Sequence, residues 1–152
     1  MDGTVEGTNG SDLIDESYTG DPEGDRIDAN DALLPGAAGN DDLVVAGPGN
    51  DTVLAGDGDD VVFGAADDDR LYGGEGNDEL NGDAGQDILW GDAGDDMLNG
   101  GAGDDTVDVG SGADRIEGGD GNDYLVGGAG SDEISGGAGL DLIWGGDPSI
   151  GV

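Results

Sequence analysis

Apolar residues recur along most of this chain at every ninth position. Between residues 46 and 144 the sequence divides into eleven consecutive nonapeptides, and the eighth position of each is Val, Leu or Ile. The residues at this position are Val53, Val62, Leu71, Leu80, Leu89, Leu98, Val107, Ile116, Leu125, Ile134 and Ile143. Self-similarity at a short, fixed period is the sequence signature of a repeat architecture.

Each nonapeptide divides into a turn part and a strand part. Positions 1–6 are rich in Gly, which adopts the positive φ that tight turns require. Positions 7–9 are expected to form a short strand whose middle side chain points inward. One aliphatic side chain is too little core for one unit, but stacked coils bring these side chains into a continuous ladder. The pattern therefore predicts an all-β solenoid in which each strand pairs in parallel with copies above and below it.

Position 6 carries the most regular polar residue. It is Asp in all eleven units, while position 4 is Gly in ten of them, with Asp67 as the exception. In a stack, these carboxylates are spaced by roughly 4.8 Å. A column of like charges at that spacing is unfavourable unless cations lie between the carboxylates. Asx-turns alone explain such a run of aspartates poorly, and the twelve-residue loop and closing Glu of an EF-hand are not present.

The composition supports a requirement for cations. The 152 residues, enough for one domain, include 36 Gly, 38 acidic residues and only three basic ones, so the formal net charge is −35. Such a charge with few apolar residues is typical of disordered chains, unless divalent cations or a basic partner neutralise it. Nucleic acid and anionic membrane surfaces are not expected as partners, because both require a positive patch.

Several kinds of site and segment are excluded by what the chain lacks. It contains no Cys and no His, which excludes disulfides, thiolate zinc sites and nucleophile–His pairs, and leaves oxygen ligands that suit calcium. No apolar run approaches membrane-spanning length, so no membrane insertion is expected. The opening residues, MDGTVEGTNG, have neither a basic n-region nor an apolar h-region, so no cleavable signal peptide is expected.

The repeat resembles a known family. Residues 73–81, GGEGNDELN, fit the pattern Gly-Gly-x-Gly-x-Asp-x-aliphatic-x of the RTX (repeats-in-toxin, hemolysin-type) calcium-binding nonapeptide. The resemblance covers about two-thirds of the chain. It implies a right-handed parallel β-roll with two nonapeptides per coil and calcium between the loops of successive coils. It also implies type I secretion, and folding outside the cell where calcium is plentiful.

The resemblance further implies a ligand set of position 6 carboxylates and of carbonyl oxygens at positions 2 and 4. Each ion would lie between one unit and the second unit after it, which gives nine or more calcium ions. Unit 64–72, with Ala65 and Asp67, is expected to hold a weaker site. The implied carboxylates are Asp12, Asp41, Asp51, Asp60, Asp69, Asp78, Asp87, Asp96, Asp105, Asp114, Asp123, Asp132 and Asp141. The implied carbonyls are those of Gly47, Gly49, Gly56, Gly58, Gly74, Gly76, Asp83, Gly85, Asp92, Gly94, Gly101, Gly103, Gly110, Gly112, Gly119, Gly121, Gly128 and Gly130.

The two ends depart from the regular repeat. Residues 1–45 are expected to form irregular coils of the same roll, with units at 7–15 and 36–44, a ten-residue spacing after the second of these, and protruding loops over 16–35. Residues 145–152 begin another unit and abandon it, and Pro148 is expected to end strand pairing.

Alternate units are expected to lie on opposite sheets, and the outward positions 7 and 9 of the two sheets differ. One sheet would present an apolar, aromatic row, and the other is mostly polar. The row consists of Leu54, Tyr72, Ile88, Trp90, Tyr124, Val126, Leu142 and Trp144. These side chains either shield the sheet by packing on one another or form an interface for self-association, a neighbouring domain or a sugar polymer.

Two functional hypotheses follow. The first is a calcium-dependent structural or assembly module, which folds outside the cell and self-associates end to end or through the aromatic sheet. The second is an extracellular module that binds a polysaccharide or a cell-surface ligand on that sheet. Catalysis is not expected, because no insertion gathers the carboxylates into a cleft.

Overall fold

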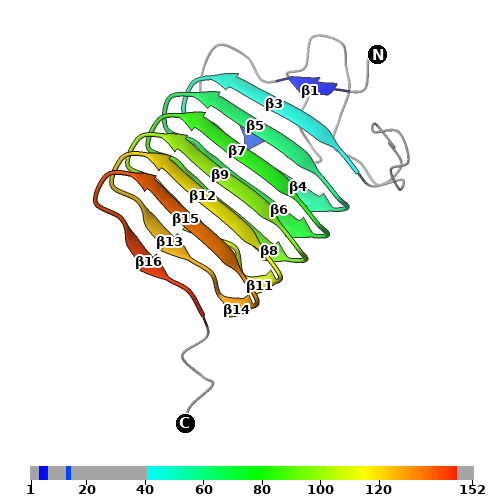
Figure 1. The fold of residues 1–152 in the computed structure, drawn as a ribbon. Helices are drawn as coiled ribbons and strands as arrows, with labels where there is room; N and C mark the ends of the chain where they lie inside the picture. Colours follow the sequence, from blue (N-terminus) through cyan, green and yellow to red (C-terminus); the bar gives the residue numbers. More distant parts are fainter. Residues whose placement is uncertain (1–3, 7–12, 15–40, 147–152) are drawn as a thin grey trace.

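The computed structural model of the chain describes residues 4–6, 13–14 and 41–146. The described residues form strands and turns but no helix, and so no helix long and apolar enough to cross a membrane. Strands alternate between two parallel sheets that face each other, and the chain winds from one sheet to the other in successive coils (Figure 1). The predicted parallel β-roll is thereby confirmed.

The strands of the two sheets follow the predicted alternation of units. The sheet that carries the predicted aromatic row, here called the aromatic sheet, contains β2 (Leu13–Ile14), β4 (Thr52–Asp57), β6 (Arg70–Glu75), β8 (Ile88–Ala93), β10 (Thr106–Asp108), β13 (Tyr124–Val126) and β16 (Leu142–Trp144), with the short β11 (Ser111–Gly112) and β14 (Ala129–Gly130) beside them. The opposite sheet, here called the polar sheet, contains β1 (Thr4–Glu6), β3 (Leu43–Pro48), β5 (Val61–Ala66), β7 (Glu79–Ala84), β9 (Met97–Ala102), β12 (Arg115–Asp120) and β15 (Glu133–Ala138).

Strand register shows that one coil contains two nonapeptides. Leu71 of β6 pairs with Leu89 of β8, eighteen residues further along, and the same offset holds through the regular part of both sheets. The position 8 side chains meet between the sheets, where those of Val53 through Leu125 are at most 1 % exposed. The aliphatic ladder that the sequence predicts is therefore the core of the molecule.

The strands are longer than predicted. The regular ones contain six residues, because positions 1–3 of the next unit continue the ladder that positions 7–9 begin. Glu75 of β6, for example, still pairs with Ala93 of β8, and Gly76 donates a 2.9 Å hydrogen bond to the carbonyl of Ala93. The prediction that positions 1–6 are all turn is wrong; only positions 4–6 turn. The reason is that position 1 faces inward, so the alternation of the strand continues through it.

One unit breaks this regularity. Its position 1 is Val109, which is fully buried where most units have Gly. The strand stops at Asp108 and resumes only at Ser111, and the neighbouring β13 and β14 are divided at the same level. Hydrogen bonds still join the coils at this level, since the Val109 N–H donates one of 3.1 Å to the carbonyl of Val126, and the carbonyl of Gly110 accepts one of 2.8 Å from Ala129.

The first regular unit is displaced by one residue from its predicted place. Asp42, not Asp41, occupies position 6, because its N–H donates a 2.7 Å hydrogen bond to Oδ1 of Asp60, and Val44 pairs with Val62 in the core. The predicted ten-residue spacing is therefore wrong, and nine-residue spacing extends back to this unit. Both Leu43 and Val44 suit position 8, so only stacking on the next coil chooses between them.

Other expectations about the ends concern residues outside the described ranges. These are the ligand Asp12, the loops over 16–35 and the tail beyond residue 146. Of the first coil, the structure describes β1, which pairs with β3, and β2, which pairs with β4. Ile14 lies opposite Val53 and is fully buried, as expected for position 8.

Candidate metal centre

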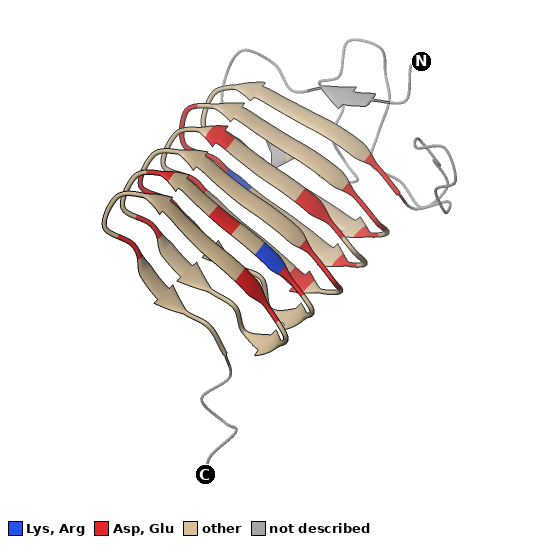
Figure 2. Cartoon of the chain, viewed as in Figure 1, with Lys and Arg blue, Asp and Glu red and all other residues tan. Residues whose placement is uncertain are grey.

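The position 6 aspartates lie in two columns, one in each set of turns that connects the sheets. Figure 2 shows acidic residues along the turns at both edges of the roll. In both columns the side chains are almost fully buried, with at most 3 % exposed from Asp51 to Asp123. Asp132 and Asp141, in the last described coil, are half-buried. One column contains Asp51, Asp69, Asp87, Asp105, Asp123 and Asp141, and the other contains Asp42, Asp60, Asp78, Asp96, Asp114 and Asp132.

In ten of these carboxylates, from Asp60 to Asp141, Oδ1 accepts a hydrogen bond from the preceding coil. The backbone N–H of Asp69 donates a 2.8 Å hydrogen bond to Oδ1 of Asp87, and that of Asp78 a 2.9 Å bond to Oδ1 of Asp96. Ten such bonds, of 2.7 to 3.2 Å, run through the two columns from Asp42 to Asp141. The aspartate columns are therefore part of the stacking of the coils as well as candidate ligands.

The second oxygen, Oδ2, has no such partner. In eight aspartates it is buried and accepts no hydrogen bond from any described residue. These are Asp60, Asp69, Asp78, Asp87, Asp96, Asp105, Asp114 and Asp123. A buried carboxylate oxygen without a partner is costly, and it is normally paired with a hydrogen-bond donor or a metal ion. This arrangement fits a cation.

The metal-free fold makes these carboxylates hard to ionise. Burial raises the pKa of Asp78 and Asp87 to about 7, since it removes water from the charged form, and neighbouring carboxylates raise it further. The hydrogen bond from the preceding coil acts in the opposite direction but is outweighed. The same causes raise the pKa to about 6 in Asp60, Asp69, Asp96 and Asp105, and raise it in Asp114 and Asp123. A divalent cation reverses this preference, because it stabilises the ionised form.

Sequence reasoning missed the role of position 1. A methyl group on Gly82 would lie 2.5 Å from Oδ2 of Asp87 and 2.5 Å from the carbonyl oxygen of Gly100 in the next coil. Gly100 is placed similarly, with Oδ2 of Asp105 at 2.5 Å and the carbonyl of Gly118 at 2.6 Å. Position 1 thus leaves open a place where a carboxylate and a backbone carbonyl converge, and both are ligand types that calcium prefers.

A signal for this role was present in the sequence. Gly occupies position 1 in eight of the eleven units, and none of these eight has a positive φ. These glycines are therefore required for space and not for backbone conformation. Ala46, Ala55 and Val109 replace them in the other three units, so the carboxylates there share the space with a side chain.

The predicted carbonyl ligands at positions 2 and 4 are arranged differently. A methyl group on Gly76 would collide with the carbonyl oxygen of Gly58, at the same position one coil earlier, and one on Gly74 with that of Gly56. These carbonyls thus point along the stack toward the next coil. The φ is positive at every predicted Gly except Gly85, and also at Asp83 and Asp92, where it is 69°.

Carboxylates alone do not complete a metal site here. Within the described ranges, no three acidic side chains come together in a way that could hold a metal ion. Any ion at the turns therefore needs backbone carbonyls beside the Asp Oδ2 atoms. The open position 1 and the carbonyls that face the next coil both supply such oxygens, so the donor set fits calcium.

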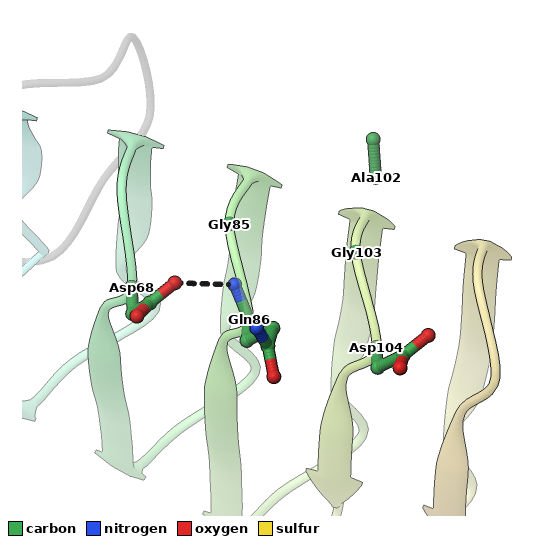
Figure 3. A pocket seen from close by; sticks show the side chains of 6 residues that line it. All are labelled: Asp68, Gly85, Gln86, Ala102, Gly103 and Asp104. Carbon is green, nitrogen blue, oxygen red and sulfur yellow. Dashed lines mark hydrogen bonds between the residues drawn. The ribbon is translucent and has the colours of Figure 1, made fainter.

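Position 5 forms a second ladder, on the outside of the turns. The backbone N–H of Gln86 donates a 2.9 Å hydrogen bond to Oδ1 of Asp68 (Figure 3), as that of Asn122 does to Asp104 at 2.8 Å. This direction is opposite to that of position 6, since the acceptor lies one coil earlier. The hollow of about 360 Å³ in Figure 3, between Asp68 and Asp104, is part of this exposed surface.

The aromatic sheet carries the predicted outward residues, but they do not form an unbroken row. Tyr72 and Trp90 stack face to face with ring centroids 4.3 Å apart and planes 7° apart. Asp108 follows Trp90 in register and separates it from Val126. Leu54, Tyr124, Leu142 and Trp144 are exposed, whereas Tyr72, Ile88, Trp90 and Val126 are half-buried.

Comparison with known proteins agrees with this geometry. The model of the RTX calcium-binding nonapeptide repeat family matches residues 36–71, 63–98, 72–107, 81–116, 99–133 and 117–147. These matches overlap and together span most of the chain, including all regular coils. A search of curated proteins gives no match.

Proposed function

Because the chain belongs to the RTX calcium-binding nonapeptide repeat family, we propose that it is an extracellular structural module whose folding is driven by calcium binding in its turns. The observation that carries this proposal is the set of eight buried Asp Oδ2 atoms with no hydrogen bond from the described chain. An isolated buried carboxylate opposes folding, and a bound cation converts it into a stabilising group.

Different groups of the roll supply different calcium ligands. The position 6 carboxylates supply charged ligands, while the carbonyls at positions 1, 2 and 4 supply neutral ones. Oδ1 of each aspartate orients the side chain, because it accepts the N–H of the preceding coil, and this leaves Oδ2 for the ion. Bound calcium supplies the positive charge that a chain of net charge −35 lacks. We expect nine or more ions per chain.

The proposed location follows from the same requirement. Extracellular calcium modules generally bind at about 10⁻⁴–10⁻³ M, concentrations that are met outside cells. A chain with these repeats would therefore stay largely unfolded where calcium is scarce and fold after export, in keeping with the type I secretion that is typical of the family.

A calcium titration followed by far-UV circular dichroism tests this proposal, with magnesium as the control. The expected result is a cooperative gain of β-structure with calcium and not with magnesium, since magnesium requires stricter octahedral geometry and loses water reluctantly. A fully folded spectrum in excess chelator would contradict the proposal. In that case the aspartates would stabilise only the turns and the stacking of the coils.

Assembly with other chains is the function that we propose for the folded module. Polysaccharide binding on the aromatic sheet is the second candidate, favoured by the exposed Trp144 and Tyr124. The stacking of Tyr72 on Trp90 weakens it, because each ring covers a face of the other that a sugar would need. Retention of the calcium-loaded monomer on immobilised polysaccharide would favour this second candidate over assembly.

A further inference from the structure

The units that carry Gly at position 1 leave a space between two oxygens of successive coils. A methyl group on Gly100 would lie 2.5 Å from Oδ2 of Asp105 and 2.6 Å from the carbonyl oxygen of Gly118, one coil later. Calcium binds oxygen ligands at about 2.3–2.6 Å. The two oxygens are therefore close enough for one ion to contact both, provided that no side chain fills the space beside the glycine.

Val109 fills this space in one unit. Its backbone keeps the position that Gly has in other units, since its N–H still donates a 3.1 Å hydrogen bond to the carbonyl of Val126. Its own carbonyl oxygen would lie 2.7 Å from a methyl group on Gly91 in the preceding coil, as the carbonyls of the glycine units do. The Val109 side chain is fully buried. It therefore extends into the space that stays open beside Gly100.

Asp114 is the position 6 residue of this unit, and its carboxylate keeps the common orientation. Oδ1 accepts a 2.8 Å hydrogen bond from the N–H of Asp96, and Oδ2 is buried with no hydrogen bond from any described residue. This orientation directs Oδ2 toward position 1, where Val109 places methyl groups. Methyl groups supply no ligand, and they displace both the ion and the water that it would need.

We propose that the residue at position 1 sets the calcium affinity of its turn, and that Val109 makes the turn of Asp114 the last to bind calcium and the first to release it. This inference rests on the calcium-driven folding proposed above. It divides the ions of the roll into a tightly bound class, beside Gly at position 1, and a weaker class, beside a larger residue.

Unit 64–72 belongs to the tighter class on this criterion, although its sequence is unusual at positions 2 and 4. Ala65 and Asp67 have φ values of 85° and 77°, so the turn keeps the positive φ of the glycine units. Its position 1 is Gly64, where a methyl group would lie 2.5 Å from Oδ2 of Asp69. The space beside the carboxylate is therefore open in this unit, unlike in the unit of Val109.

The core at Val109 does not depend on the ion. The buried valine adds apolar contact between the sheets, which stabilises the coil with or without calcium. The turn of Asp114 can therefore lose its ion while the coil stays folded. The roll would then respond to calcium in two steps, first by folding and then, at higher concentration, by filling this turn.

Nuclear magnetic resonance of the side-chain carboxyl ¹³C signals tests the inference during a calcium titration. Asp105 is the matched reference for Asp114, because both are at position 6 and both are 2 % exposed. The Asp105 signal should reach its final position as the chain folds. The Asp114 signal should continue to shift until the calcium concentration is at least about tenfold higher, the lower end of the effect of altering a group around a metal ligand.

Val109→Gly should abolish this difference, and the reciprocal Gly100→Val should transfer the late shift to Asp105. Val107→Ala is the control, since it removes apolar volume from a fully buried position 8 and leaves position 1 unchanged. It should preserve the late shift of Asp114. Circular dichroism follows the folding of each variant.

The wild-type chain alone can overturn the inference. If the carboxyls of Asp105 and Asp114 titrate together in the folded chain, position 1 does not set the affinity, and the proposed function still stands. A late shift of Asp114 that survives Val109→Gly would have the same meaning. A chain that calcium does not fold would overturn both.

Discussion

The backbone N–H of Asp69 donates a 2.8 Å hydrogen bond to Oδ1 of Asp87, while Oδ2 of the same carboxylate is buried without a hydrogen bond from the described chain. One side chain thus joins two coils and leaves a charged oxygen for a cation. The pair explains how a calcium-binding roll can keep its register: the hydrogen bond fixes the carboxylate, and a bound ion would stabilise its charge.

Asp87→Asn separates the two roles of this carboxylate. The amide oxygen can still accept the N–H of Asp69, but the charge is lost. We expect calcium binding at this turn to weaken by about 10–100-fold or more, the range seen even when a partner outside the ligand set is removed. Metal-free stability at pH 7 should rise, because a buried carboxylate with a raised pKa is replaced by a neutral group. Calorimetric titration measures the first effect, and the fraction of β-structure in chelator, followed by circular dichroism, measures the second.

Asp68→Asn is the matched control. It removes the same charge from the exposed position 5 and also keeps its acceptor, for the N–H of Gln86. Calcium binding should change little, since exposed charges contribute weakly through water and salt. Equal calcium binding by Asp87→Asn and the wild type would show that Oδ2 is not a ligand.

Gly82→Ala tests the open position 1. Its methyl group would lie 2.5 Å from both Oδ2 of Asp87 and the carbonyl oxygen of Gly100, so the carboxylate must move. We expect a loss of about 1–3 kcal/mol from overpacking, with weaker calcium binding in addition. Thermal unfolding in calcium measures the loss of stability, and calorimetric titration measures the calcium binding.

Gly145→Ala serves as the control for that substitution. It is also at position 1, has no positive φ, and would bring its methyl group no closer than 3.7 Å to Ile134. It should leave stability nearly unchanged. If both variants behaved alike, glycine at position 1 would not be required for space.

The metal-free roll should lose stability as the pH rises from about 4 to 7. Burial raises the pKa of the position 6 carboxyls, to about 7 in Asp78 and Asp87, so the folded chain holds protons that the unfolded chain releases. Their contribution is therefore fully present below pH 4 and is lost as the pH passes through 6 and 7. With calcium the trend reverses, since binding requires ionised carboxylates. Far-UV circular dichroism in chelator, which reports the fraction of folded chain, and denaturant unfolding in calcium check the sign from pH 4 to 7; the same trend in both would contradict it.

Ala65→Gly should stabilise the fold. Ala65 has a φ of 85°, a conformation that costs a residue with a Cβ atom roughly 1–2 kcal/mol. The expected gain is about 1 kcal/mol, reduced by the greater entropy of Gly in the unfolded chain. The neighbouring Ala66→Gly, at a position without positive φ, should instead cost about 0.5–1 kcal/mol. Urea denaturation in calcium compares the two, and a loss of stability in both would refute the strain at Ala65.

The stability lost when a position 8 side chain is truncated should depend on the coil in which that side chain lies. Leu89 is fully buried, so Leu89→Ala is expected to cost about 2–5 kcal/mol. Ile143→Ala, at the same repeat position in the last described coil, should cost under about 1 kcal/mol in dilute monomer, because the side chain is already half exposed. Calcium-loaded thermal unfolding at low protein concentration provides the comparison. Similar losses of stability in the two variants would mean that the Ile143 side chain is buried in solution.

The sequence by itself determined the period of the repeat, the aliphatic core and the recurring aspartate at the turn. Each of these repeats every nine residues, and the physical requirement that produces it is met within a single unit: a turn, an inward side chain and a polar group at the turn.

The tertiary structure alone decided the features that depend on the neighbouring coil. Asp42 and not Asp41 occupies position 6. Leu43 and Val44 both suit the inward position 8, and only the pairing of Val44 with Val62 distinguishes between them. The use of position 1 as open space, the stacking of Tyr72 on Trp90 and the exposure of Ile143 follow from contacts between residues about eighteen apart, or from their absence in the last described coil. A nine-residue pattern is the same in every unit, so it does not determine which residue of the neighbouring coil a side chain contacts, or in which coil that side chain is exposed.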